Sequence, residues 1–376
     1  MNARRIYLDY NAGAPLRPVA AAAMAAAIDR LGAGGNPSSI HGEGRAVRDV
    51  VERARDAVAR LAGALREQVV FTSGGSEANS LGIHALLAGR RDATLVVSRT
   101  EHPAVTGLAE ARAAAGGLVR WIDVAPDGRW RLDQLTGLGP DTVAAISAVN
   151  HETGVIQPVG DVAAQIRAGG GRVLVDAVQA AGKLALGPLH AAVDALVLSA
   201  HKLGGPAGVG ALVLGARFDI TNGPMVAGTQ ERGRRGGTEN VVGIAGFGAA
   251  ATASDLATWP AIARLGDELE AGLRALGAEI AGDGAPRVGG TINARFAGVP
   301  GDAIVMGLDL AGVAASVGAA CSSGSLKASP VLRAMGRTDD EAREAVRLSL
   351  GWGSHADDPA AVLARLAPVL AQCRAV

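Results

Sequence analysis

Residues 195–211 read Ala-Leu-Val-Leu-Ser-Ala-His-Lys-Leu-Gly-Gly-Pro-Ala-Gly-Val-Gly-Ala, and this stretch guides the interpretation of the rest of the chain. It begins as a short apolar run, typical of a buried strand, and ends in a glycine-rich loop. Lys202 stands where the strand ends. An ammonium there is costly to desolvate unless it is paired, and desolvation also activates an amine to form a Schiff base with an aldehyde cofactor. The alternative is a surface lysine in a hairpin turn.

The composition is that of a folded chain with a balanced charge. Its 376 residues are 49% hydrophobic and 19% charged, which is long for one domain and shows no signature of disorder. Because 36 basic side chains balance 36 acidic ones, we expect neither nucleic acid nor an anionic membrane as the main partner. The two cysteines, Cys321 and Cys373, lack zinc-site spacing and cannot form a disulfide framework. We therefore expect no bound metal and a reduced, cytoplasmic setting.

No targeting segment or membrane span is expected from the sequence. The apolar run from Val19 to Ile28 stops at Asp29, so it is too short to cross a bilayer. An alanine-rich core helix explains this run better.

Short apolar runs alternate with helical patterns along most of the chain. The runs lie at residues 6–8, 69–71, 95–97, 143–146, 173–175, 196–198 and 211–214. Helical patterns cover residues 18–31 and 47–61 and the stretch that ends at Leu87. Such runs suit strands buried on both faces, as in a mainly parallel sheet covered by helices.

The pattern changes from about Pro260 onward. A helix over residues 262–276, strand-like residues 291–293 and a terminal helix after Pro359 follow. We interpret this part as a second α+β domain, completed by the N-terminal residues.

A glycine-rich turn follows the run at 69–71 and opens a helix. Backbone N–H groups of Gly74, Gly75 and Ser76 would point to one place at the positive end of that helix, which favours an anion such as a phosphate. An ordinary strand–helix turn with Ser76 as its N-cap explains the same residues.

Other polar side chains also follow strands. Asp176 ends the run at 173–175, and a carboxylate there needs a cation or several donors; a pyridinium nitrogen is one candidate, with Gln179 reaching a neighbouring ring oxygen. A helix cap or a structural salt bridge is the alternative. His102 could stack on a flat ring or shuttle a proton, although a lone histidine is more often a hydrogen-bonded polar residue. Ligands collect at the carboxyl ends of strands in an open α/β sheet, so the shared location indicates one site.

Ten short motifs occur in order along the chain. They are Leu8-Asp-Tyr10, Gly35-Asn-Pro-Ser38, Thr72-Ser-Gly-Gly-Ser-Glu-Ala-Asn79, Glu101-His-Pro103, Asn150-His-Glu-Thr-Gly154, Asp176-Ala-Val-Gln179, Ser199-Ala-His-Lys202, Arg235-Gly-Gly-Thr-Glu239, Cys321-Ser-Ser-Gly324 and Arg347-Leu-Ser-Leu-Gly351. Together they resemble the pyridoxal 5'-phosphate (PLP)-dependent cysteine desulfurases of the type that feeds iron–sulfur cluster assembly. This family belongs to the fold type I, class-V aminotransferase PLP enzymes. The resemblance covers essentially the whole chain.

The resemblance implies an architecture and an activity. Residues 14–257 would form a three-layer α/β/α large domain with a mainly parallel seven-stranded sheet. Residues 1–13 and 258–376 would form a smaller α+β domain that carries the catalytic cysteine. The activity would be conversion of L-cysteine to L-alanine, by a homodimer that passes sulfur to an acceptor protein such as an iron–sulfur scaffold.

The resemblance also implies roles around the cofactor ring. Lys202 would hold PLP as a Schiff base and later move protons between the substrate and the cofactor. Asp176 would pair with the pyridine nitrogen, which makes the ring an electron sink. Gln179 would bind the phenolic oxygen. His102 would stack on the ring and belong, with Lys202 and Cys321, to the catalytic residues.

Further implied roles concern the phosphate and the substrate. The phosphate would be held by Gly75, Ser76, Ser199 and His201, and by Thr238 from the partner subunit. Arg347 would bind the substrate carboxylate as a planar bidentate fork, with Asn36 as a weaker candidate for the same group.

Cys321 is the residue that would distinguish this activity within the fold. Its neighbours in residues 317–325 are small and offer few apolar side chains to bury a thiol. Its thiolate would attack the substrate sulfur and form a persulfide, leaving alanine. A buried structural cysteine is the alternative, and Cys373, in the terminal helix, is interpreted as structural.

One motif departs from the family pattern. Asn150-His151-Glu152 stands where the family usually has Asn-Asn-Glu, so His151 occupies the place of the asparagine near the cofactor oxygen. Either His151 or Asn150 could make that contact, and the assignment stays open between them.

Two other classes of function remain possible from the sequence. One is a related PLP enzyme of the same fold, an aminotransferase or a selenocysteine lyase. An aminotransferase has no use for Cys321, and a selenocysteine lyase would ignore cysteine. The other is a non-catalytic scaffold of the PLP fold. The presence of Lys202, Asp176, Cys321 and Arg347 argues against it.

Overall fold

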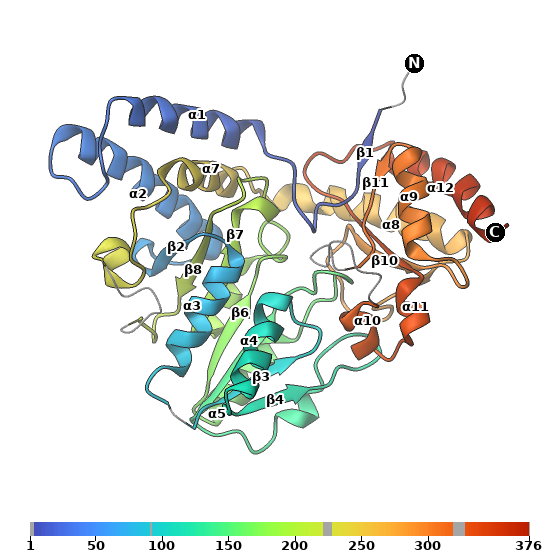
Figure 1. Ribbon diagram of the computed structural model, residues 1–376, viewed down its shortest axis with the longest axis horizontal. Coiled ribbons are helices and arrows are strands. Elements are labelled where there is room, and N and C mark those ends of the chain that lie inside the picture. Colours follow the sequence, from blue (N-terminus) through green and yellow to red (C-terminus); the bar gives the residue numbers. More distant parts are fainter. Residues whose placement is uncertain (1–3, 91, 221–227, 319–327, 376) are drawn as a thin grey trace.

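The computed structural model describes residues 4–90, 92–220, 228–318 and 328–375. A large sheet with helices on both faces makes up one part of the molecule, and a smaller group of strands and helices lies beside it (Figure 1). The expected mixed α/β fold with a large, mostly parallel sheet is confirmed.

The described residues form a large sheet of seven strands. Its members are β2 (Val69–Thr72), β3 (Thr94–Ser98), β4 (Val119–Ile122), β5 (Thr142–Ser147), β6 (Arg172–Asp176), β7 (Ala195–Ser199) and β8 (Gly210–Leu214). They lie in the order β2-β8-β7-β6-β5-β3-β4. Since β8 is antiparallel to both β7 and β2, the carboxyl ends of β2 and β7 reach the same edge as those of the parallel strands.

Helices cover both faces of the large sheet. They are α1 (Pro18–Gly32), α2 (Gly42–Ala62), α3 (Gly75–Leu87), α4 (Pro103–Ala114), α5 (Val159–Ala168), α6 (Leu186–Ala192) and α7 (Val241–Thr252). Side chains alternate along each strand: Val173 and Val175 pack in the core with α2, α5, α6 and α7, whereas Leu174 packs in the core with α3 and α4. Continuous apolar runs therefore form strands that are buried on both faces.

The smaller part of the molecule has its own sheets and helices. Its strands are β1 (Ile6–Tyr7), β9 (Glu279–Ile280), β10 (Thr291–Arg295), β11 (Val313–Ala314) and β12 (Ala345–Ser349). Its helices are α8 (Trp259–Ala275), α9 (Gly301–Leu310), α10 (Pro330–Ala334), α11 (Asp339–Arg343) and α12 (Asp358–Arg374). A separate core joins Ile6 and Leu8 to side chains of α8, β10, α9, β12 and α12. The boundaries at residues 13/14 and 257/258 remain a prediction.

Several element ends differ from the sequence expectation. α2 begins at Gly42 rather than near Val47, because the His41 side chain accepts a hydrogen bond from Gly44 N (3.3 Å) and caps the helix. α8 and α12 each include a proline in the first turn, where its missing N–H costs nothing. β4 and β12 were not expected as strands. The sequence of β12 does not read as a buried strand, because the charged residue Arg347 stands at its centre. The structure nevertheless buries Arg347, with 1% of its surface exposed.

Short 3-10 helices connect several elements. They are η1 (Arg66–Gln68), η2 (Leu132–Leu135), η3 (Ala200–Lys202), η4 (Gln230–Gly233) and η5 (Leu256–Thr258). Within the described ranges, no single helix is both long and apolar enough to cross a membrane.

Candidate active site

Lys202 lies at the end of β7, in η3, where the chain leaves the large sheet. Its Nζ donates to two backbone carbonyls of the N-terminal segment, Asn11 O (2.6 Å) and Ala12 O (2.7 Å). The turn that follows is close-packed: a Cβ on Gly205 would lie 2.9 Å from Ala200 Cβ. The glycine-rich loop therefore lets η3 turn tightly, and the amine faces the junction between the large sheet and the N-terminal segment.

Asp176 ends β6, the strand next to β7. Its Oδ2 accepts a hydrogen bond from Asn79 Nδ2 (2.7 Å), and its Oδ1 accepts one from Val178 N (3.0 Å). The carboxylate is 7% exposed and fixed by these two donors. Such a buried, oriented carboxylate suits a protonated ring nitrogen.

A group of polar contacts surrounds Asn11, which the sequence analysis did not identify. Asn11 O accepts Gln179 Nε2 (2.9 Å) as well as Lys202 Nζ, and Asn11 Oδ1 accepts Lys183 Nζ (3.0 Å). The side-chain nitrogen Nδ2 of Asn11 donates to His151 O (3.2 Å). Asn11 thereby connects residues that follow several strands. Its hydrogen bonds depend on the folded arrangement, so no local sequence pattern reveals them.

The start of α3 and the end of β7 come together. Gly75 opens α3, and a Cβ there would lie 3.1 Å from Val178 Cγ2 and 3.4 Å from Ser199 Cβ, so glycine permits this approach. Ser76 is the next residue of α3 and is exposed. The helix N-terminus offers backbone N–H groups to an anion, as the sequence predicts.

Ser199 Oγ lies 2.9 Å from His201 Nδ1. Burial, together with the nearby Lys202 and His102, lowers the pKa of His201 to about 4. The imidazole is therefore neutral at physiological pH and acts as a hydrogen-bonding group rather than a cation.

The two histidines His102 and His151 face each other. Their ring centroids are 5.4 Å apart and their planes are inclined by 72°. Burial, together with the nearby His102, Arg347 and Lys202, holds the pKa of His151 well below its usual range, so this imidazole is neutral. His102 also caps α4, because its Nδ1 accepts Ala104 N (3.1 Å).

Asn150 has a different environment from His151. Its Nδ2 donates to Thr100 O (2.9 Å), and its Oδ1 accepts from Glu152 N (2.9 Å) and from both the N–H and the hydroxyl of Thr153. The Asn150 amide thus shapes its own turn. His151 is the member of this pair whose ring faces His102.

Arg347 projects from the centre of β12 toward the same place. Its Nη2 donates to Asp9 Oδ1 (2.9 Å) and its Nη1 to His151 O (3.1 Å). Its Nε is buried and has no hydrogen-bond partner among the described residues. A guanidinium with an unused donor suits a carboxylate ligand, because a buried donor without a partner is costly.

Cys321 lies outside the described residues, but the chain on both sides of its segment is placed. Before it, Ser316 pairs with Arg347 through two backbone hydrogen bonds (2.7 and 3.1 Å). After it, Ser329 Oγ donates to Glu152 Oε2 (2.6 Å). The residues that precede and follow the Cys321 segment therefore lie beside Arg347 and next to His151. Cys373 packs partly against the core of the smaller part, as expected of a structural cysteine.

Asn36 and Thr238 lie on exposed loops. Asn36 Oδ1 accepts Ser38 N (2.8 Å) in the loop between α1 and α2, at the end of the large sheet farthest from the smaller part (Figure 1). Within one chain the structure therefore does not bring Asn36 to Arg347. Thr238 is exposed and follows Arg235, whose Nε forms an ion pair with Glu77 (2.7 Å) in the first turn of α3.

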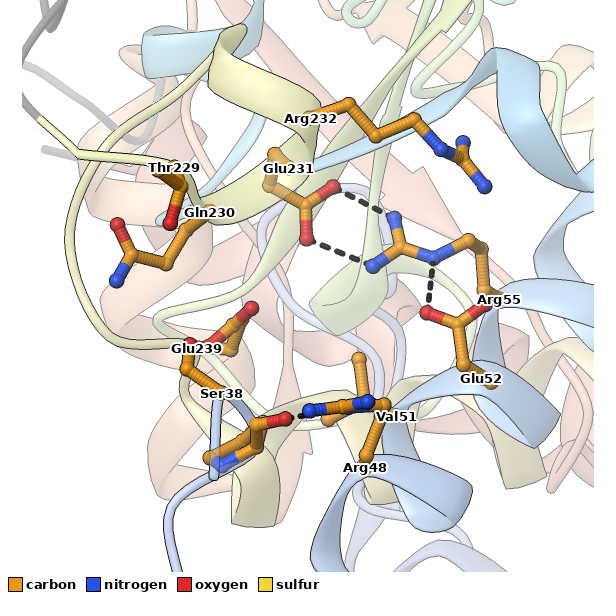
Figure 2. Close-up of a pocket in the computed structure, with 11 residues that line it drawn as sticks. Ser38, Arg48, Val51, Glu52, Arg55, Thr229, Gln230, Glu231, Arg232 and Glu239 are labelled. Atoms are coloured by element: carbon orange, nitrogen blue, oxygen red, sulfur yellow. Dashed lines mark hydrogen bonds and ion pairs between the residues drawn. The ribbon is translucent and has the colours of Figure 1, made fainter. Parts of the chain in front are cut away.

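A pocket joins these two loops. Figure 2 shows its wall, where Glu231 forms a bidentate ion pair with Arg55 (2.6 and 2.8 Å) and Ser38 and Glu239 lie nearby. Glu231 adopts φ 48°, a left-handed conformation that is strained for a residue with a side chain. The ion pair holds this strained turn, to which the sequence analysis assigned no role.

Sequence reasoning missed four residues of the site: Asp9, Asn11, Asn79 and Lys183. Asp9 and Asn79 fall inside motifs that carried the resemblance but received no role. The composition could have drawn attention to Lys183, because the sequence contains only three lysines, Lys183, Lys202 and Lys327.

Comparison with known proteins supports these observations. Residues 6–361 match the family model for class-V aminotransferases. A cysteine desulfurase of Frankia sp. (strain EuIK1) is 42% identical over 368 residues, covering 92% of this chain and 86% of that protein. A solved NifS-like protein superimposes with a TM-score of 0.88 at 29% identity, covering 98% of this chain and 100% of the other. SspA, solved in complex with cysteine, gives a TM-score of 0.79 at 28% identity, covering 92% of this chain and 98% of the other.

Proposed function

This chain belongs to the class-V aminotransferase family and is a PLP-dependent cysteine desulfurase, and from that premise we propose how its own residues convert L-cysteine to L-alanine. The observation that carries the proposal is the placement of the Lys202 amine and the Asp176 carboxylate. They lie at the ends of two neighbouring strands, in a site that Arg347 also faces.

The residues present fit PLP, which is flat and anionic and carries an aldehyde. Lys183, Lys202 and Arg347 bring positive charge to the site, which favours an anionic cofactor and substrate. Glycine at position 75 lets the start of α3 lie close to Ser199, so backbone N–H groups of the helix N-terminus and the Ser199 hydroxyl are near enough to hold one phosphate. Asp176 offers an oriented carboxylate to a protonated ring nitrogen.

Cofactor binding is assigned to residues at the sheet edge. Lys202 Nζ would attach PLP covalently, and Asp176 would hold the proton on the pyridine nitrogen. His102 would stack on the ring, while Gln179 and His151 would donate to its phenolic oxygen. The phosphate would be held by Gly75, Ser76, Ser199 and His201 of one chain and Thr238 of its partner. Once bound, PLP withdraws electrons from the substrate carbon that carries the amino group.

Arg347 is assigned to the substrate carboxylate. Its Nε donor has no partner, and its bond to Asp9 leaves the guanidinium fixed in orientation. A carboxylate that reached this fork would remove the unsatisfied donor and hold the substrate in one orientation. Lys202 Nζ then takes the proton from the substrate Cα and returns a proton to the product.

The sulfur transfer is assigned to Cys321. Its thiolate attacks the substrate sulfur, so that an S–S bond forms while the C–S bond breaks and the electron pair of that bond stays with the substrate carbon. Protonation of that carbon gives alanine. In sum, L-cysteine and the Cys321 thiol become L-alanine and a Cys321 persulfide, with no external oxidant or reductant.

A homodimer, an acceptor protein and a cytoplasmic location complete the proposal. Exposed apolar side chains on α1 and the following loop, Val19, Ile28 and Ile40, support an interface between copies. A sulfur-acceptor protein, such as an iron–sulfur scaffold, then removes the persulfide sulfur.

The two cysteines provide a matched test. The holoprotein is incubated with L-cysteine, and alanine and sulfide are measured for the parent, Cys321→Ala and Cys373→Ala. We expect Cys321→Ala to lose alanine formation about a thousandfold and Cys373→Ala to stay within about twofold of the parent. Alanine formation at full rate in Cys321→Ala contradicts the persulfide route. Turnover of selenocysteine without turnover of cysteine contradicts the assignment of L-cysteine as the substrate.

A further inference from the structure

Lys183 is a basic residue in the site that the assignments above do not use. All but three of the 36 basic side chains of the sequence are arginines. Two of the three lysines, Lys183 and Lys202, donate to the same residue, Asn11. Lys202 is explained by its covalent role, for which an amine is needed. Lys183 calls for a separate explanation.

The contacts of Lys183 define what its ammonium does. It lies in a helical turn after β6, four residues beyond Gln179. Its Nζ donates to Gln179 Oε1 (3.1 Å) and to Asn11 Oδ1 (3.0 Å), and it lies 5.4 Å from the centroid of the Trp259 ring. Two amide oxygens and one aromatic face therefore surround its three N–H groups.

No carboxylate in the described parts of the chain forms an ion pair with Lys183. The nearby charged groups are Lys202 and Arg347, both positive. Burial, together with these two cations, lowers the pKa of Lys183 to about 7. A partly buried cation among other cations, held by neutral oxygens, needs an anion that the chain itself does not supply.

We propose that Lys183 is a positioning residue that orients the Gln179 amide as a hydrogen-bond donor to the cofactor's phenolic oxygen and offsets the negative charge of that oxygen. This inference rests on the proposed function, which assigns Gln179 to that oxygen.

The orientation follows from hydrogen-bond chemistry. An ammonium has donors and no acceptor, so the atom of Gln179 that it touches must be the oxygen. The Gln179 nitrogen then points the other way, where one N–H reaches Asn11 O (2.9 Å) and the second is left for a ligand. Without Lys183 only the bond to Asn11 O would hold the amide, and a rotated amide would present its oxygen, which would repel an anionic oxygen.

The site of Lys183 is fixed by the residue before it. Gly182 adopts φ +72°, and a Cβ there would lie 3.0 Å from Leu203 Cδ2, next to Lys202. The turn after β6 is therefore packed against the turn after β7. This contact sets the spacing between the two lysines.

The test compares Lys183→Met, which keeps the length of the side chain and removes its charge, with Lys183→Arg, which keeps donors. The readouts are the dissociation constant of PLP and the pH midpoint of the visible absorption band of the bound cofactor. For Lys183→Met we expect PLP to bind about tenfold more weakly and the midpoint to rise by about one pH unit, because a donor and a positive charge near the phenolic oxygen are lost. We expect Lys183→Arg to recover most of both.

A second pair of variants tests whether the effect passes through Gln179. Lys183→Met is repeated in the Gln179→Leu background. We expect more than half of its effect on both readouts to disappear there, because the two residues act as a unit. An equal effect in both backgrounds, or no effect in either, overturns the proposal.

A mapping experiment separates this inference from the proposed function. The holoprotein is reduced with borohydride, and peptide mass analysis locates the trapped PLP. Attachment to Lys202 with unchanged readouts in Lys183→Met overturns the role of Lys183 alone. Attachment to Lys183 overturns both, since that lysine would then be the covalent carrier.

Discussion

The two walls of the site differ in how their polar groups are satisfied. On the wall made by the large sheet, Glu101, Asp176 and Asn150 are each held by several hydrogen bonds, although Asn79 Oδ1 and Glu152 Oε1 have no partner among the described residues. Glu101 accepts from Trp130 Nε1 (3.0 Å) and Ser147 N (2.6 Å), and Asp176 and Asn150 are fixed in the same way. Burial raises the pKa of Glu101 to about 7 despite these donors.

The wall made by the N-terminal segment and β12 is less complete. Arg347 Nε has no hydrogen-bond partner among the described residues. At the border of this wall, Asn11 Oδ1 accepts a hydrogen bond from Lys183, which lies in the turn after β6, so an amide oxygen rather than a carboxylate meets that ammonium. Among the described residues Asp9 is the one carboxylate that pairs with Arg347, so positive charge exceeds negative charge here.

This difference between the walls suggests that one binds the cofactor and the other binds the substrate. A wall whose Asp176 carboxylate and Asn150 amide are each held by several hydrogen bonds is preorganised for a cofactor that stays in place. A wall with an unused donor and excess positive charge is suited to a substrate that arrives and leaves, because binding removes the unsatisfied group. The following variants test the division, beginning with the largest expected effect.

Asp176→Asn changes the preorganised wall while keeping the shape of the side chain. We expect kcat to fall about a thousandfold, because the ring nitrogen loses the carboxylate that keeps it protonated. Steady-state alanine formation measures this loss. A decrease of less than about tenfold contradicts the role given to Asp176.

Arg347→Met changes the opposite wall. We expect kcat/KM for L-cysteine to fall about a hundredfold, from loss of a charge-assisted fork, while the dissociation constant of PLP stays within about twofold. Arg274→Met, on the exposed side of α8, serves as the control. A comparable loss of PLP affinity in Arg347→Met would show that the two walls are not separate.

Asn79→Ala tests the support of Asp176. Removing one of its two donors is expected to weaken PLP binding about tenfold and to lower kcat by a similar factor, since a bond to a charged group is lost. Equilibrium titration with PLP measures the change. Unchanged affinity would mean that Val178 N alone fixes the carboxylate.

The smallest effect concerns the stability of the PLP-free protein. Burial lowers the pKa of Lys183 to about 7, below the value of about 10.5 in an unfolded chain. Between these values the unfolded state binds more protons, so the contribution of Lys183 to the free energy of unfolding rises with pH, by at most about 1.4 kcal/mol per pH unit. Unfolding from pH 7 to 9 is compared for the parent and Lys183→Met. We expect the parent to gain more stability, and parallel curves would contradict the lowered pKa.

The fold class could be predicted from the sequence, because strands buried on both faces appear as continuous apolar runs in this chain. Continuous apolar runs marked six of the seven strands found in the described part of the large sheet, and glycine-rich turns marked where they end. β4 escaped because its residues 119–121 are only partly buried, and β12 escaped because a buried arginine interrupts its pattern.

The candidate site was predictable only where chemistry lies in a motif. Lys202 and Asp176 stand at strand ends, where a charged group needs a partner. Asn11 contributes a backbone carbonyl, which every residue has, so its part in the site depends wholly on the folded arrangement. Lys183 was visible as one of few lysines, but its role required its contact with Gln179.

The most direct test of the account is a single turnover followed by mass analysis. PLP-loaded protein is mixed with one equivalent of L-cysteine without reductant, and alanine and the masses of the Cys321 and Cys373 peptides are measured. The account predicts one alanine for each sulfur atom added to the Cys321 peptide, with the Cys373 peptide unchanged. Alanine without added sulfur on Cys321, or sulfur on Cys373 instead, would contradict it.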